Sequence, residues 1–487
     1  ASYYCLLCEN VEVADDYSWV QYKLREDAYW HDGQPVTIED VVWTFDAIKR
    51  DGGMVWKNFY RDIVRLERID RWTFKFHFSD SAERTRQLVL QTATFAPQAK
   101  HFWKTRAFTE TTLEPLLGNG PYRIGAIDSG NKIVFERVKD YWGKDLNVTQ
   151  GYYNFDEIEL TYFFDKSIML QALRAGVFDW WFEESEKDFA TAYDFPAYRE
   201  GLFKKATYKM GFSYGMHFGV VLNQRRKPLD DIRVREALTL AYNFEWANRV
   251  YWHGGMDRSN SYFWRSGLQA MGSVSTAELL LLEPFRSQIP DRVFTDPIEL
   301  PKNDSFGRNR ETLLRADALL EEAGWVMQDF ERVNAVTGEP MKLDFVVTYE
   351  DHLRMLIPFV DNLKRLGINA GLRRVEGNLM TNRLRNYDFD ATVRKYYTWK
   401  VPIPNRMRMQ ITSRYANVQN MTNYAGIENP VVDFLVEKIA YATTEEELNT
   451  AGRALDRVLI HNYYLIPDGV PLGRHVVNWD RLGHPPL

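Results

Sequence analysis

A tight turn followed by a capped helix, within residues 30–48, is the part of this sequence that most constrains its fold. Asp32 and Gly33 form a dipeptide that is typical of a tight turn after a strand. Thr37, followed three residues later by Asp40, matches the capping-box pattern that begins a helix. Apolar residues then recur at helical spacing, at Val41, Val42, Phe45 and Ile48. We therefore predict a helix that begins next to Thr37 and packs its apolar face against a core.

The rest of the sequence alternates predicted strands with predicted helices. Aromatic residues alternate with polar ones at Trp72, Phe74, Phe76 and Phe78, which predicts a half-buried strand. Further strands are predicted at residues 133–138, 158–164, 343–348 and 368–375. Helices are predicted at residues 167–175, 231–243, 310–323, 353–366 and 444–460. The alternation is clearest after residue 263, where it predicts an α/β lobe, whereas residues 17–135 are predicted to be mostly strands.

The composition excludes several classes of protein. At 487 residues the chain is long enough for more than one core, so two or three lobes are expected. Its net charge of −6 argues against a nucleic-acid partner, which usually requires a basic face. No apolar run approaches the roughly 18 to 20 residues of a membrane span. The nine histidines include no pair at metal-ligand spacing, so neither a metal site nor a cofactor is predicted.

The two cysteines, Cys5 and Cys8, form a C-x-x-C motif. Such a motif could be a redox site or half of a metal site. No second cysteine pair is present to complete a zinc site. The motif is therefore not expected to be functional, and the sequence leaves open whether the two residues form a disulfide.

Several short segments carry a resemblance to one family. In chain order, five of them resemble the motifs of the family 5 extracytoplasmic solute-binding proteins, which deliver peptides, nickel or sugars to ABC transporters; they lie at residues 30–45, 118–124, 140–142, 223–238 and 319–325. Others are similar to the branch that binds oligopeptides and microcin C, at residues 154–158, 225–226, 244–248, 261–263 and 454–459. Because the first five matches are collinear and span nearly the whole chain, the resemblance is specific.

The resemblance implies a mixed α/β architecture, the large type II periplasmic-binding-protein fold, with two hinged lobes and an extra small domain. Residues 1–150 would form the small, mostly-β domain, and residues 151–250 part of lobe I. Residues 251–470 would form lobe II, and residues 471–487 would return toward lobe I. Compared with that family the sequence begins inside the fold, so an N-terminal segment is expected to be absent.

The same resemblance implies a transport function without catalysis. Ligand would bind in the cleft between the lobes, and hinge closure would present the closed form to a membrane permease. The expected partners are a small peptide or peptide-like ligand and the permease subunits, with no nucleic acid. The expected location is the periplasm or, in the absence of an outer membrane, the extracytoplasmic side of the membrane. The expected state is a monomer that needs no cofactor.

The segment from residue 389 to residue 407 bears on ligand choice. In peptide-binding relatives the corresponding strand and loop line the cleft and hold an aspartate that pairs with the peptide α-amine. Trp399 and Lys400 occupy that place here, and a lysine would repel an amine. Arg406 and Arg408 could instead face a carboxylate or a phosphate. The candidate ligand-binding residues are His217, Arg383, Tyr396, Tyr397, Trp399, Asn405, Arg406 and Trp181.

Two alternatives to peptide transport remain open from the sequence. The same fold could bind a non-peptide solute such as an opine, a sugar phosphate or a sugar, because the amine-anchoring acid is missing. The segment at residues 211–215 also matches the G-x-S-x-G motif of hydrolases, with Ser213 as nucleophile. That chemistry needs a helix directly after the serine, whereas residues 217–222 are predicted to form a strand. The hydrolase interpretation is therefore the less favoured one.

Overall fold

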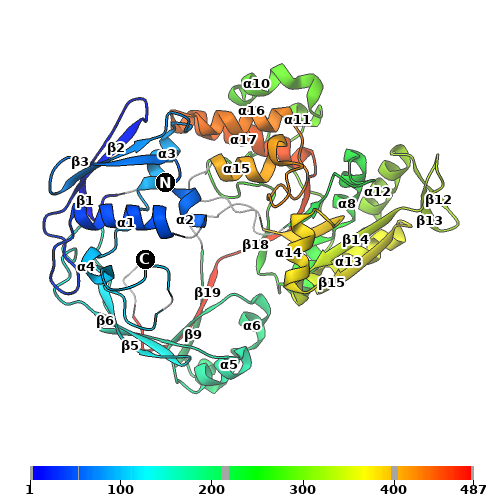
Figure 1. The fold of residues 1–487 in the computed structure, drawn as a ribbon. Coiled ribbons are helices and arrows are strands. Elements are labelled where there is room, and N and C mark those ends of the chain that lie inside the picture. The colour runs from blue at the N-terminus through cyan, green and yellow to red at the C-terminus, as the bar shows by residue number, and fades with distance from the viewer. Residues whose placement is uncertain (1–3, 53, 111, 210–218, 396–403, 484–487) are drawn as a thin grey trace. The chain divides into compact units, whose positions relative to one another are not determined.

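The computed structural model describes residues 4–52, 54–110, 112–209, 219–395 and 404–483 (Figure 1). The chain divides into two compact units, Ala1–Phe178 and Asp179–Leu487. Each unit has its own sheets and its own hydrophobic core. The mixture of helices and sheets agrees with the α/β architecture that the sequence predicts.

The first unit contains two antiparallel sheets, one with strand order β1-β2-β4-β3 and one with order β5-β6-β7. The predicted aromatic strand is β4, and its Phe74, Phe76 and Phe78 side chains are buried, which confirms the period-two pattern. The strands are β1 (Cys8–Val13), β2 (Trp19–Leu24), β3 (Ile63–Arg68), β4 (Thr73–Phe78), β5 (Tyr122–Asp128), β6 (Lys132–Arg137) and β7 (Glu157–Thr161). The helices are α1 (Ile38–Asp51), α2 (Met54–Phe59), α3 (Arg86–Thr92), α4 (Lys100–Trp103) and α5 (Lys166–Arg174).

Helix α1 begins where the capping-box pattern predicts. The Thr37 amide donates to Asp40 Oδ2 at 2.9 Å, which closes the box at the first turn. Val41 and Phe45 are buried against the β1-β2-β4-β3 sheet. Burial of two such side chains contributes about 3 to 6 kcal/mol, so the helix is held by its packed face as well as by its cap.

Three of the sequence motifs meet in the first unit. The His31 amide donates to Gly118 O at 2.9 Å, and His31 Nε2 lies 2.8 Å from Gly120 O. Trp142 Nε1 donates to Asn119 O, also at 2.9 Å. The turn at residues 118–120 is therefore held by two aromatic rings from distant segments, and these motifs act as scaffold.

Cys5 and Cys8 form a disulfide, which resolves the pairing that the sequence leaves open. Both residues border a cavity of about 520 Å³ that is otherwise lined mainly by apolar side chains of β1, β2, β4 and α3. Among the described residues, no group of three or more histidine, cysteine or acidic side chains could hold a metal ion. In the same residues no helix is long and apolar enough to cross a membrane.

The second unit is organised around a five-stranded sheet with the order β15-β14-β16-β10-β17. Strands β14, β15 and β16 are parallel, whereas β10 is antiparallel to β16 and β17. The strands of the sheet are β10 (Gly219–Leu222), β14 (Lys342–Val347), β15 (Asn369–Arg374), β16 (Ala391–Arg394) and β17 (Leu465–Pro467). Smaller sheets are formed by β8 (Trp180–Glu183), β19 (Arg474–Trp479) and β9 (Phe203–Tyr208), by β11 (Met256–Arg258) and β18 (Gly469–Pro471), and by β12 (Trp325–Gln328) and β13 (Glu331–Asn334).

Helices cover both faces of this central sheet. Val220 and Leu222 belong to a core shared with α8, α12 and α13, whereas Val221 between them belongs to a core shared with α16 and α17. A strand with two buried faces is expected to be apolar throughout, as β10 is. The helices are α6 (Glu186–Thr191), α7 (Pro196–Arg199), α8 (Ile232–Ala241), α9 (Phe244–Tyr251), α10 (Thr276–Leu282), α11 (Arg292–Thr295), α12 (Arg310–Glu322), α13 (Glu350–Arg365), α14 (Gly377–Arg385), α15 (Pro404–Ile411), α16 (Pro430–Ala440) and α17 (Glu445–His461), with short 3₁₀ helices η1 (Glu283–Gln288) and η2 (Ser413–Tyr415).

Most predicted element ends agree with the structure to within one residue, and three differ by more. The helix predicted to begin at residue 353 begins at Glu350. The strand predicted to reach residue 164 ends at Thr161, and the Phe164 side chain is exposed. The helix predicted to reach residue 243 ends at Ala241, because Asn243 caps the next helix by accepting from the Trp246 amide at 2.9 Å. The glycines predicted to end helices α5, α12 and α13 all have positive φ, at Gly176, Gly324 and Gly367.

Candidate ligand-binding site

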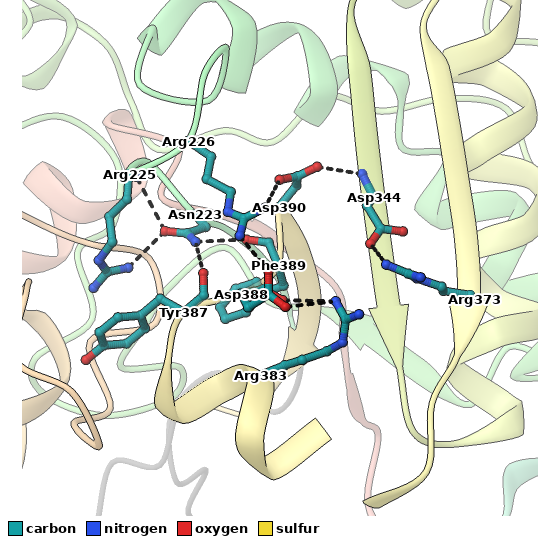
Figure 2. Close-up of polar contacts among 10 residues, drawn as sticks. All are labelled: Asn223, Arg225, Arg226, Asp344, Arg373, Arg383, Tyr387, Asp388, Phe389 and Asp390. Carbon is teal, nitrogen blue, oxygen red and sulfur yellow. Dashed lines mark hydrogen bonds and ion pairs between the residues drawn. The ribbon is translucent and has the colours of Figure 1, made fainter. Parts of the chain in front are cut away.

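The motif that begins at Asn223 connects the end of β10 to the residues directly before β16. Asn223 is fully buried, and its Nδ2 donates to Tyr387 O at 3.0 Å and to Phe389 O at 2.8 Å (Figure 2). Its Oδ1 accepts from Arg225 Nη1 at 2.9 Å. A side chain with both donors and an acceptor is required here, because the groups that it meets are two carbonyls and a guanidinium.

Arg225 extends this connection toward the loop that follows α15. Its guanidinium lies 3.7 Å from the centroid of the Tyr387 ring. Its Nε donates to Ala416 O at 2.9 Å, and its Nη2 donates to Asn423 O at 2.7 Å. Stacking and several backbone contacts are typical of a structural arginine, so we assign Arg225 to the support of the site.

Arg226 and Arg383 form a charged cluster with two aspartates beside the same strand. Arg226 pairs with Asp388 at 2.7 Å and with Asp390 at 3.3 Å. Arg383, on α14, lies 3.4 Å from Asp388 and points toward it (Figure 2). Burial raises the pKa of Asp390, although Asp390 also accepts from the Asp344 amide at 2.8 Å. Arg383, predicted from the sequence as a ligand contact, is engaged with this cluster, and its ligand role stays a prediction.

A cavity of about 670 Å³ opens at the carboxyl ends of strands β14 and β16. In α/β sheets, ligands bind beyond the carboxyl ends of the parallel strands, because the loops there diverge. The side chains that line it come from the ends of both strands, the first turn of α13, α14, α15, β11, β18 and the segments between elements. They are Glu184, Trp252, Met256, Thr348, Tyr349, Asp351, His352, Met380, Thr392, Val393, Arg394, Lys395, Arg406, Gln410, Thr422, Tyr424 and Pro471.

Charged groups of both signs line this cavity, with cations in excess. The cations are Arg394, Lys395 and Arg406, and the carboxylates are Glu184 and Asp351. Burial lowers the pKa of both Arg394 and Lys395. A desolvated cation is stabilised by an anion close to it, so the cavity is better suited to an acidic or zwitterionic ligand than to a simple cation.

The candidate residues of the sequence analysis lie in different places. Arg406 lines the cavity. Asn405 Oδ1 accepts from Arg408 Nη1 at 2.9 Å, and Arg408 Nε in turn donates to Glu437 at 2.7 Å, so Arg408 holds α15 to α16. Trp181 lies on β8 opposite Val477 of β19, and its buried Nε1 has no hydrogen-bond partner among the described residues. His217, Tyr396, Tyr397 and Trp399 lie outside the described residues, as do Lys400 and Ser213.

Sequence reasoning missed several residues of this cavity, above all Thr392, Arg394 and His352. The segment that contains the first two was recognised as the strand before the cleft loop, but only its later aromatic residues were selected. Residues two apart on a strand face the same side, so Thr392 and Arg394 could have been paired from the sequence. His352 could not, because its proximity to β16 depends on the packing of α13 against the sheet.

The stability of the chain is expected to fall as the pH is lowered from about 6.5 to about 4, in part because of His352. Burial lowers the pKa of His352 to about 4; the negative charge of Asp351 opposes this shift, and the positive charge of Arg394 adds to it. Below pH 6.5 the unfolded chain takes up a proton that the folded chain binds only near pH 4, so protonation favours unfolding by up to about 3 kcal/mol. Urea midpoints of the wild type and of His352→Gln, measured across this range, should diverge as the pH falls. Parallel curves would contradict the assignment.

Comparison with known proteins identifies the family. The family model described as bacterial extracellular solute-binding proteins, family 5 middle, matches residues 2–417. The chain belongs to this family of solute-binding proteins. It is 37% identical over 492 residues to the uncharacterised protein y4wM of Sinorhizobium fredii, covering 99% of this chain and 73% of that protein. It is 36% identical over 490 residues to the probable peptide-binding protein YejA of Agrobacterium fabrum, covering 99% of this chain and 79% of that protein.

The solved structures support the fold of this family member. NikA from Brucella suis, in complex with Fe(III)-EDTA, superimposes with a TM-score of 0.72 at 17% identity, covering 99% of this chain and 88% of that one. At this identity the likeness shows the fold alone. The family model and the relative at 36% identity confirm the family recognised from the five sequence motifs, and with it the role of a solute-binding component of an ABC importer.

Proposed function

We propose that this chain binds oligopeptides or peptide-like solutes in the periplasm and delivers them, as a monomer, to the permease of an ABC importer. The likeness to a probable peptide-binding protein along 99% of the chain carries this proposal. The transport role requires no bond to be made or broken, so the chain acts as a binding protein and not as an enzyme.

The cavity of the second unit supports a peptide-sized ligand. Its volume of about 670 Å³ falls within the range of roughly 300 to 1,000 Å³ that is common for small-molecule sites. Tyr349, Trp252 and Tyr424 offer aromatic walls beside polar groups, an arrangement that accepts variable side chains while charged groups fix the main chain.

Native mass spectrometry of freshly purified protein tests the proposal. We expect bound species whose masses, after gentle denaturation, correspond to a mixture of short peptides. Titration of ligand-stripped protein with defined tripeptides and pentapeptides, followed by tryptophan fluorescence, should then show saturable binding. A single non-peptide solute in the first experiment, together with no response to any peptide in the second, would overturn peptide binding and leave only the family assignment.

A further inference from the structure

A buried histidine and a buried glutamate contact each other on one face of the β8-β19-β9 sheet. The side chains of His475 on β19 and of Glu186, the first residue of α6, are 6% and 5% exposed. His475 Nε2 lies 2.7 Å from Glu186 Oε2, and the Phe189 ring stacks on the imidazole with a centroid distance of 3.9 Å. Neither residue of the pair lines the cavity of about 670 Å³, so direct contact with a ligand does not explain the pair.

The second ring nitrogen lets this pair take up a proton without losing a hydrogen bond. His475 Nδ1 lies 2.9 Å from Thr207 Oγ1 on the neighbouring strand β9. A hydroxyl donates to a neutral imidazole nitrogen and accepts from a protonated one, so this contact is kept in both states of the ring. Only the charge changes. With a neutral imidazole and an ionised Glu186 the pair has a net negative charge, whereas a protonated imidazole makes the pair neutral.

Groups of both signs face the pair from the neighbouring elements. Glu183, at the end of β8, is buried and adds a negative charge, whereas the exposed His253, in the turn after α9, acts in the opposite direction. Lys205 of β9 lies on the Phe189 ring, 4.6 Å from its centroid. Burial is the largest effect and raises the pKa of Glu186, although its histidine partner opposes the rise. A buried net charge is costly, so the surroundings favour proton uptake by the pair.

The carboxylate of Glu186 also lies directly against Gly255, in the turn between α9 and β11. A Cβ atom at that glycine would be 1.9 Å from Glu186 Oε2, far inside the distance at which two such atoms can approach. Gly255 O in turn accepts from the Leu472 amide at 2.9 Å, in the segment between β18 and β19. The pair therefore connects the β8-β19-β9 sheet to the turn that precedes β11.

This connection adjoins the ligand cavity of the second unit. Each of its residues Glu186, Gly255 and Leu472 is within two residues of a side chain that lines the cavity, and these side chains are Glu184, Met256 and Pro471. A ligand that touches both walls favours the state in which the connection is made. When the connection opens, Glu186 meets water and holds a proton less tightly, because the rise in its pKa depends on burial. The connection is therefore strongest at low pH and weakens as the pH rises.

We propose that Glu186, His475 and Gly255 form a proton-linked latch, which strengthens ligand binding as the pH falls from about 7.5 to about 5.5. This inference rests on the proposed function and deepens it, because it describes how ligand affinity is regulated by residues that do not line the cavity. The coupling is reciprocal, so a ligand that binds more tightly in acid must also increase proton binding by the latch.

Isothermal titration calorimetry with trialanine measures this coupling. The affinity of the wild type is expected to rise about 3- to 10-fold between about pH 7.5 and about pH 5.5, since one fully linked proton changes an affinity by at most tenfold per pH unit. Titrations near neutral pH in phosphate and in imidazole, two buffers with different enthalpies of ionisation, should show that a fraction of a proton is taken up with each ligand bound.

Two variants test the latch, and a third is a matched control. Glu186→Gln keeps the shape but cannot change its charge, so its affinity should vary by less than about 2-fold over the same pH range. Gly255→Ala displaces the Glu186 carboxylate and should weaken binding in acid by about 3-fold or more. His101→Gln removes another histidine–carboxylate contact, with Asp32 at 2.8 Å in the first unit, and should match the wild type at every pH.

Hydrogen exchange of the ligand-free protein tests the latch without any peptide. The Leu472 amide reports on the connection, because it donates to Gly255 O. After correction for the intrinsic pH dependence of exchange, its protection factor should rise as the pH falls in the wild type and in His101→Gln. In Glu186→Gln the protection factor should not depend on pH.

The outcomes separate the latch from the proposed function. If trialanine binds but Glu186→Gln keeps the full pH dependence of the wild type, the latch is disproved and peptide binding stands. If neither trialanine nor pentaalanine binds the wild type, the proposed function is overturned, and the protection factor of Leu472 alone decides the latch. Should Glu186→Gln fail to fold, His475→Gln replaces it and should move the rise in affinity to lower pH, because only the carboxylate remains to take up the proton. An unchanged pH profile of that variant would contradict the latch.

Discussion

Replacing Asn223 by leucine is expected to destabilise the chain by about 3 kcal/mol or more, although the two side chains have nearly the same shape. The substitution leaves the carbonyls of Tyr387 and Phe389 without their donor, at a position that is fully buried. It also removes the acceptor of Arg225 Nη1. Each buried polar group left without a partner costs about 1 to 3 kcal/mol, so the loss of several outweighs the gain in apolar burial.

Urea denaturation followed by tryptophan fluorescence measures this effect. The matched control is Asn378→Leu, at an exposed position in the first turn of α14. Exposed substitutions of this kind usually change stability by less than about 0.5 kcal/mol. Similar urea midpoints for the two variants would contradict the connection of β10 to β16 through Asn223, and the assignment of this motif as structural support would be wrong.

Replacing Asp456 by alanine is expected to cost about 3 to 5 kcal/mol, even though alanine is the better helix former. Asp456 lies on α17 and is fully buried. Its Oδ2 accepts from Ser261 Oγ at 2.6 Å and from the Ala270 amide at 2.9 Å, and its Oδ1 accepts from the Tyr262 amide at 2.8 Å. The variant leaves all three donors buried without an acceptor.

The environment of α17 makes this loss difficult to compensate. The next residue, Arg457, is also fully buried and lies 3.5 Å from the buried carboxylate of Glu278. Asp456 on the helix and Glu278 on the facing segment therefore make two separate contacts that hold residues 259–278 to α17. Glu446→Ala, at an exposed position in the first turn of α17, is the control and should change stability by less than about 0.5 kcal/mol. Equal midpoints for the two alanine variants would contradict a connecting role for Asp456.

The buried polar residues of the second unit differ in how many of their polar atoms have hydrogen-bond partners. Asn223, Arg225 and Asp456 have hydrogen-bond partners for their buried polar groups, so their removal is expected to be costly. Thr392 Oγ1 and Arg394 Nε have none among the described residues, so their removal should cost little stability. Groups that are kept at a cost to stability are common at functional sites, where the ligand supplies the missing partner.

The sequence by itself determined the family, most of the elements and several of their ends. Capping boxes at Thr37 and Thr444, and the glycines after α12 and α13, act within one or two turns of the chain, so local pattern is enough to predict them. The aromatic alternation of β4 is equally local, because side chains of a strand alternate between its faces. The motifs around Asn223 were recognised in the same way, as short patterns of residue types.

Only the tertiary structure decided what those motifs contact and where the cavity lies. Asn223 contacts residues 387 and 389, Asp456 contacts residues 261–270, and His352 lines the same cavity as Arg394, all through residues far apart in the sequence. Such contacts depend on strand order and on which helix covers which face, and neither is fixed by the local pattern. That Thr392 Oγ1 and Arg394 Nε have no hydrogen-bond partner among the described residues could not be found from the sequence either, since a missing hydrogen bond depends on all surrounding groups at once.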